Sequence, residues 1–222
     1  ASRSGQTVGV DTVNNAVWFA HALSHHNAAV QESRDPCLLP KALKNPTAQA
    51  GTRTAHLRDG VALCRFLHWL GTEGQGTTEL KAAEKLESFR AEGTEYCGES
   101  FPAISGSGPN GAVIHYRVTP QTDRTLQQNE VYLIDSGGQY PQGTTDVTRT
   151  IWTGPDTPAP ALKQNFTRVL KGHLRLGPAR FPKGTTGSAL KSLARFALWR
   201  ARSYYDHGTG QGVRSFFSVD EG

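Results

Sequence analysis

The sequence of 222 residues contains no methionine and only three cysteines. Cys37, Cys64 and Cys97 are irregularly spaced, which excludes a CxxC motif and a disulfide framework. We therefore expect reduced thiols and an intracellular protein, with a mitochondrion or plastid among the candidate compartments. Because the first residue is alanine, we also expect a processed or partial chain.

Long apolar runs are absent as well. No stretch approaches the roughly 18 apolar residues that a membrane-spanning helix requires. The first residues, ASRSGQTVGVD, lack the apolar core of a secretory signal. These absences exclude a helical membrane span and predict a protein that is not secreted.

Charge of one sign is in modest excess, with 24 Lys and Arg against 19 Asp and Glu and a formal net charge of +5. Many of the basic residues lie between Arg175 and Arg214. Solvated helix faces are the simplest interpretation, and contact with RNA or an acidic protein is the alternative. No RNP-type stacking motif supports RNA binding.

Hydrophobic periodicity predicts four helices. The first begins at Asn45-Pro46 and continues to about Leu70, and the second covers about residues 79–92. The third follows Pro155, and the fourth follows the turn FPKGTTG.

The middle of the chain has a strand-like pattern instead. The runs AVIHYRV (112–118), VYLIDSG (131–137) and TDVTRTI (145–151) predict short strands, the last two joined as a hairpin by a Pro/Gly turn. A short strand, VGVD, is expected near the N-terminus. The order of elements favours an α+β fold in which helices pack on an antiparallel sheet.

Two aspartates lie at the inner ends of the predicted hairpin. Asp135 ends an apolar strand and Asp146 begins the next one. If these strands pair, the two carboxylates converge on one face and suit a divalent cation. Spacing alone leaves open the alternative that each is a turn or strand-end residue.

The stretch HGTGQGV, from His207 to Val213, raises the same question. Histidines four residues apart often bind one metal, but the residue four positions after His207 is Gln211. The motif predicts either a metal site or the remains of one.

Several segments closely resemble the aminopeptidase P family, the Xaa-Pro aminopeptidases. They are YLIDSGGQYPQGTTDVTRTI, ISGSGPNGAVIHYR, KALKNPTAQAGTRTAHLRDGVALCRFLHWL, FTRVLKGH and FPKGTTGSALKSLAR. The resemblance implies a truncated pita-bread domain over residues 39–222, with a curved antiparallel sheet and helices packed on its outer face. Residues 1–38 resemble the end of the domain that precedes catalysis in that family.

The resemblance also implies a dimetal site, usually with manganese, whose ligands are two Asp, one His and two Glu. The Asp ligands correspond to Asp135 and Asp146, and two substrate-side histidines correspond to His115 and His207. Gln211 stands in the position of the family's His ligand. HGTGQGV is therefore interpreted as the remains of a site.

Three further site positions are substituted. Trp152 stands where the family commonly has His, Arg214 replaces a small residue, and Asp220 in VDEG replaces an active-site His. The stretches that carry the two Glu ligands do not occur among the 222 residues. The resemblance therefore implies that Asp135 and Asp146 are vestigial and that this chain alone has no functional catalytic residue and holds no cofactor.

The predicted function is a non-catalytic aminopeptidase P-like pseudoenzyme, a structural subunit of a larger complex. One alternative is a fragment of an active Xaa-Pro aminopeptidase with manganese or another divalent pair. A further alternative is a basic RNA- or peptide-binding module on the same fold.

The run SFFSV predicts a strand with an open edge near the end of the printed sequence. Side chains alternate along a strand, so its large apolar residues cannot all face one side. Open edges with aromatic residues pair readily with other chains. We therefore expect other protein subunits to cover Phe216, Phe217 and Val219.

Overall fold

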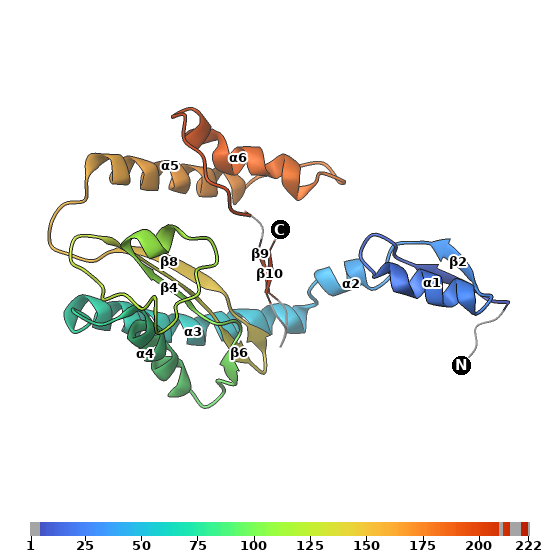
Figure 1. The fold of residues 1–222 in the computed structure, drawn as a ribbon, viewed down its shortest axis with the longest axis horizontal. Coiled ribbons are helices and arrows are strands. Elements are labelled where there is room, and N and C mark those ends of the chain that lie inside the picture. Colours follow the sequence, from blue (N-terminus) through green and yellow to red (C-terminus); the bar gives the residue numbers. More distant parts are fainter. Residues whose placement is uncertain (1–4, 209–210, 214–218, 222) are drawn as a thin grey trace. The chain divides into compact units, whose positions relative to one another are not determined.

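The structure is a computed structural model that describes residues 5–208, 211–213 and 219–221 (Figure 1). The chain divides into two compact units, Ala1–Gln49 and Ala50–Gly222. The boundary predicted after residue 38 separates the end of a preceding family domain from the pita-bread domain. It stays a prediction. Within the described ranges, no helix is both long enough and apolar enough to cross a bilayer.

The first unit is built on two parallel strands, β1 (Thr7–Val10) and β2 (Ala29–Glu32), joined through helix α1 (Val17–His25). Helix α2 (Leu38–Ala42) follows. Asp11 directly follows β1 and accepts hydrogen bonds from the side chain of Asn14 and from backbone N–H groups, which lower its pKa to about 2. The sequence predicted β1 but gave no signal for β2.

Two long helices, α3 (Pro46–Thr72) and α4 (Glu79–Ala91), confirm the predicted pair. The Asn45 side chain accepts the N–H of Ala48 at 2.8 Å, and Thr78 caps α4 by accepting from Lys81. Both caps satisfy backbone donors that have no partner inside the helix.

The main sheet of the second unit is antiparallel, in the order β4 (Ile104–Ser107), β5 (Val131–Ser136) and β8 (Val147–Trp152). A smaller antiparallel sheet has the order β3 (Gly98–Glu99), β6 (Gly138–Tyr140) and β7 (Gly143–Thr144). The predicted hairpin is confirmed by the pairing of β5 with β8 and of β6 with β7.

Alternation along β5 decides which face of the sheet carries the core. Tyr132, Ile134 and Ser136 are buried, and the first two pack in the cluster that contains Phe66 of α3 and Leu86 of α4. Each large apolar side chain buried there stabilises the fold by about 1.5–3 kcal/mol. Because side chains alternate, Asp135 lies on the opposite face, away from this core.

The predicted strand over residues 112–118 is wrong. The chain instead forms the 3₁₀ helix η1 (Gly108–Ala112) and then a turn in which His115 has φ of 51°. Val113 and Ile114, which suggested a strand by their β-branched side chains, are 53% and 49% exposed. The local turn residues of the stretch GPNG override the β-propensity that follows them.

Helices α5 (Pro160–Leu176) and α6 (Gly187–Trp199) confirm the predicted third and fourth helices and pack against each other. Gly172 of α5 is buried where they meet, and a Cβ there would collide with the carbonyl oxygen of Ala194. The close approach of the two helices therefore requires glycine at this position.

We expect Gly172→Ala to lower the free energy of unfolding by about 1–3 kcal/mol, because the added methyl group forces α5 and α6 apart. Gly60→Ala is the matched control. Gly60 lies inside α3 with open space around its Cβ position, so alanine should stabilise the helix by about 0.5–1 kcal/mol. Urea denaturation of both variants checks this, and equal effects of the two substitutions would contradict it.

Two short strands, β9 (Gln211–Gly212) and β10 (Asp220–Glu221), pair antiparallel. Of the residues predicted to contact a partner, Phe216 and Phe217 lie outside the described residues. The predicted substituted position Arg214 lies outside them as well. Val219 is described, is half-buried, and lies just before β10 rather than in a strand. The predicted strand over SFFSV is thus untested in most of its length.

Candidate functional site

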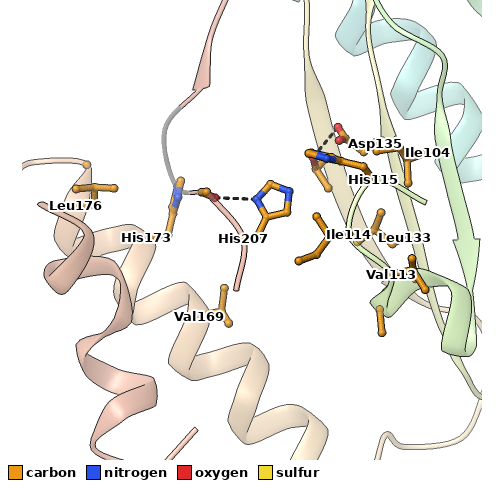
Figure 2. A pocket seen from close by; sticks show the side chains of 15 residues that line it. Ile104, Val113, Ile114, His115, Leu133, Asp135, Val169, His173, Leu176 and His207 are labelled. Atoms are coloured by element: carbon orange, nitrogen blue, oxygen red, sulfur yellow. Dashed lines mark hydrogen bonds between the residues drawn. The ribbon is translucent and has the colours of Figure 1, made fainter. Parts of the chain in front are cut away.

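A cavity of about 630 Å³ lies on the face of the main sheet that carries Asp135 (Figure 2). The sheet contributes apolar side chains, among them Ile104 and Leu133, and α5 contributes Val169. Polar groups enter from several elements, namely Asp135, His115, Thr148, His173 and His207. An apolar cavity with a few convergent polar side chains is the usual form of a small-ligand or active site.

Asp135 is placed by the ladder of the main sheet. It faces Ile104 of β4 on one side and Thr148 of β8 on the other. The Thr148 hydroxyl donates to its Oδ1 at 2.7 Å. The carboxylate is half-buried and oriented by a neighbouring side chain on a rigid strand.

Asp146 directly precedes β8 and is half-buried. Ser136 faces Val147, and Gln139 faces Thr144. The register between these pairs places Asp146 on the same face as Thr148 and diagonal to Asp135. The hairpin thus brings the two carboxylates to one face, although Asp146 is not among the residues that line the cavity.

Gly137 is required for this register. A Cβ at that position would collide with the carbonyl oxygen of Thr145. On the opposite strand, the Thr145 hydroxyl accepts the N–H of Gly138 at 2.8 Å. The close approach of the two strands fixes the segment between the two aspartates.

His115 and His207 form an edge-to-face pair beside the cavity. Their ring centroids are 5.2 Å apart with an interplanar angle of 76°. Nδ1 of His207 lies 2.8 Å from the carbonyl oxygen of Gly208. The structure therefore brings together three of the predicted site residues, Asp135, His115 and His207, around one cavity.

Arg195 of α6 anchors the segment that carries His207. Its Nη2 donates to the carbonyl oxygen of His207 at 2.5 Å. The side chain is only 5% exposed, and its guanidinium lies 4.5 Å from the ring centroid of Tyr205. The attraction between this cation and the tyrosine ring offsets part of the free-energy cost of removing the charge from water. The sequence indicated only that Arg195 is basic.

His173 lines the same cavity from α5 and was missed as a site residue. It belongs to the helix predicted after Pro155, and a single histidine in a helix carries no sign of chemistry. That α5, β5 and β8 line one cavity is a tertiary feature, and no local pattern in the sequence reports it.

Comparison with known proteins decides the family. The model of metallopeptidase family M24 matches residues 50–221, which is most of the chain. The chain belongs to metallopeptidase family M24. The resemblance to aminopeptidase P and the partial pita-bread fold are thereby confirmed.

Curated relatives of this M24 chain include a probable Xaa-Pro aminopeptidase P of Laccaria bicolor, 48% identical over 85% of the chain and 30% of the relative. The Xaa-Pro aminopeptidase ApepP of Drosophila melanogaster is 45% identical over 96% of the chain and 36% of the relative. The chain therefore spans about a third of the length of these relatives.

Among solved structures, the X-prolyl aminopeptidase of Caenorhabditis elegans matches with a TM-score of 0.79 and 39% identity, over 88% of this chain and 32% of that one. That protein is described as a cytosolic enzyme with a di-nuclear active site. The prolidase of Pyrococcus furiosus, at 20% identity and a TM-score of 0.77 over 99% of this chain and 63% of that one, shows the same fold.

The positions predicted to be substituted relative to the family lie in two different parts of the structure. The Trp152 indole donates to the carbonyl oxygen of Asp156 at 2.8 Å and lines a second cavity of about 460 Å³, together with Leu70 of α3. In the β9–β10 ladder, Gln211 faces Glu221, and Asp220 faces Gly212. The backbone pairing thus brings two of the substituted positions into one small ladder.

The residues present fit an M24 metal centre only in part. Asp135 and Asp146 offer hard oxygen donors on one face, which suit a divalent cation. Gln211, at the position that the resemblance assigns to a His ligand, carries a neutral amide, which is a weaker metal ligand than an imidazole. Over the part of the chain that the structure describes, no three His, Cys, Asp or Glu side chains form a group that could hold a metal ion.

Proposed function

We propose that the protein containing this chain is a metal-dependent aminopeptidase that removes the N-terminal residue of peptides whose second residue is proline. The observation that carries the proposal is the cavity that gathers Asp135, His115 and His207. Identities of 39–48% to proteins named as aminopeptidases of this type support the same substrate class.

Each side chain has a distinct role in this proposal. Asp135 and Asp146 would hold the metal ions, which polarise the scissile carbonyl and activate water when bound. His115 and His207 each present ring nitrogens that can donate or accept a hydrogen bond, and they would hold the peptide. Apolar Ile104 and Leu133 exclude water around it.

A second candidate is the non-catalytic structural subunit, and the substitutions Gln211 and Asp220 favour it. Loss of an imidazole from a metal site reduces affinity more than loss of an outer hydrogen-bond partner, which already costs about 10–100-fold. In this case other subunits would cover Phe216, Phe217 and Val219. Contact with RNA or an acidic protein stays a prediction, and we propose an intracellular location in either case.

Hydrolysis of the tripeptide Ala-Pro-Ala by the whole protein that contains this chain, in the presence of Mn²⁺, tests the two candidates. We expect release of free alanine above the metal blank, abolished by a chelator and by Asp146→Ala because the carboxylate pair is broken. Glu84→Ala is the matched control, since it removes an exposed carboxylate of α4 and should retain full turnover. Release no faster than in Asp146→Ala would refute the aminopeptidase and leave the non-catalytic subunit.

A further inference from the structure

Glu79 is the first residue of α4, and its side chain is fully buried, with 0% exposure. Burial of a carboxylate is costly unless hydrogen bonds replace its water. Here Oε1 accepts from the Ser107 N–H at 2.7 Å and from the Asn110 amide at 3.0 Å. Oε2 accepts from the Tyr116 hydroxyl at 3.0 Å and from the Arg124 N–H at 3.3 Å.

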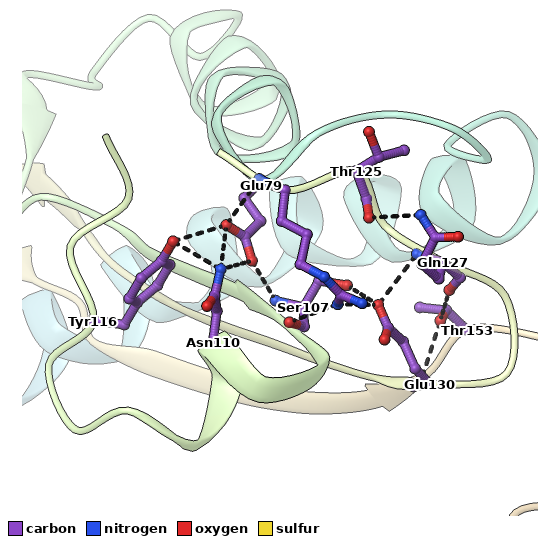
Figure 3. A network of polar contacts seen from close by, with 9 residues as sticks. Glu79, Ser107, Asn110, Tyr116, Thr125, Gln127, Glu130 and Thr153 are labelled. Atoms are coloured by element: carbon purple, nitrogen blue, oxygen red, sulfur yellow. Dashed lines mark hydrogen bonds and ion pairs between the residues drawn. The ribbon is translucent and has the colours of Figure 1, made fainter. Parts of the chain in front are cut away.

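Two of these partners, Asn110 and Tyr116, converge on Glu79 (Figure 3) and lie in the sequence on either side of His115. Asn110 lies in η1, before the turn, and Tyr116 follows His115 directly. The Asn110 amide also donates to the Tyr116 oxygen at 2.9 Å, which links the two ends of the turn to each other. Burial raises the pKa of Tyr116, so its hydroxyl keeps the proton that it donates to Glu79.

His115 needs such support because its φ of 51° is in the left-handed region. A residue other than glycine adopts that region only where its surroundings hold it. Apolar packing does not do so here, since the neighbouring Val113 and Ile114 are about half exposed. The polar contacts of Asn110 and Tyr116 with Glu79 are the buried interactions on either side of the turn.

A second carboxylate, that of Glu130, fixes two of the residues that donate to Glu79. Glu130 accepts from Nη1 of Arg124 at 2.6 Å and from the Ser107 hydroxyl at 2.5 Å. Burial alone would raise the pKa of Glu130, but these hydrogen bonds lower it. Ser107 and Arg124, which donate backbone N–H groups to Glu79, are therefore themselves fixed.

We propose that Glu79 is a positioning residue of the candidate site. Through Asn110 and Tyr116 it holds the left-handed turn at His115, and so it sets the contact between the His115 and His207 rings beside Asp135. The role of His115 toward a peptide rests on the proposed function, whereas the ring geometry does not.

The full chain with isotope-labelled histidine provides the test, because the proton–proton cross-peaks of its eight histidines report ring contacts without any peptide. His115→Gln identifies the His115 signal. In Glu79→Gln, the new amide nitrogen faces donors and can accept from none of them. We expect the His115–His207 cross-peak to disappear and the His115 signal to shift, while the other histidine signals stay in place.

Asp59→Asn is the matched control. It alters another fully buried carboxylate of the same unit, which binds Arg90 and Tyr140 rather than the His115 turn. We expect this variant to lose stability but to keep the cross-peak. Tyr116→Phe removes one of the hydrogen bonds to Glu79 and should weaken the cross-peak, which keeps the test decisive if Glu79→Gln does not fold.

Retention of the cross-peak in folded Glu79→Gln, or in Tyr116→Phe where Glu79→Gln does not fold, would overturn the proposal. Equal loss in Asp59→Asn would do the same. Peptide turnover is a separate readout. If wild type releases alanine, Glu79→Gln should raise the KM or lower the kcat for the peptide. The effect should be larger than in Tyr116→Phe, where the cross-peak is only weakened. If the whole protein that contains this chain releases none, the proposed function fails and the cross-peak still decides the role of Glu79.

Discussion

Asp59→Ala is expected to lower the free energy of unfolding of the second unit by about 3–5 kcal/mol. Asp59 and Arg90 are 0% and 1% exposed and form a bidentate pair, with Nε to Oδ1 at 2.7 Å and Nη2 to Oδ2 at 3.1 Å. The Tyr140 hydroxyl donates to the same carboxylate at 3.0 Å. The variant leaves a buried guanidinium without its counter-ion, and this uncompensated charge is the main source of the loss.

The exposed pair of Arg65 and Glu92 provides the control, because both side chains are about half exposed. Glu92→Ala should have a far smaller effect on the free energy of unfolding, since water screens the charges of this pair. Thermal or urea unfolding of both variants decides the matter. A loss for Asp59→Ala as small as that for Glu92→Ala would show that the buried pair is not needed.

Gln211→His is expected to increase the affinity of the full chain for Mn²⁺ by about 10-fold or more. An imidazole is a stronger donor than an amide oxygen, and the M24 resemblance assigns this position to a histidine ligand of the site that contains Asp135 and Asp146. Isothermal titration with Mn²⁺ alone measures the change. Because the binding histidine must be neutral, the gain should diminish as the pH falls below about 6.5.

Gln128→His adds a histidine at an exposed position outside this cavity and is the control for nonspecific binding. Asp146→Ala in the Gln211→His background should remove the gained affinity, because two of the ligands then no longer act together. Equal affinity of wild type and Gln211→His would mean that position 211 does not join the carboxylate pair.

The parts of the fold that sequence reasoning predicted are those that local periodicity determines. Helices α3 to α6 have apolar stripes and recognisable starts, and the β5–β8 hairpin has strands on both sides of a Pro/Gly turn. The strand over 112–118 failed because the turn chemistry of GPNG and the contacts of Tyr116 outweigh the β-branched residues. β2 was not predicted, because a strand of four residues is too short to show a clear hydrophobic alternation.

The candidate site divides in the same way. Alternation along a hairpin is enough to expect Asp135 and Asp146 on one face, and the family resemblance added His115 and His207. Glu79, Arg195 and His173 were not predicted. Each is polar or charged in an ordinary helix, where exposure is the normal expectation, and its role depends on partners distant in the sequence.

The hairpin also affects the order in which the parts of the site become available during synthesis. The strands that carry Asp135 and Asp146 are joined by a short turn, and hairpins of this kind form within about 1–10 μs. His207 follows about 60 residues later, which corresponds to about 3–12 s of translation at 5–20 residues per second. Because α3, α4 and β4 also precede the hairpin, the oxygen donors and the elements that pack with their strands are synthesised before α6 and His207. In the proposed metal site, the two carboxylates are therefore synthesised several seconds before the imidazole of His207.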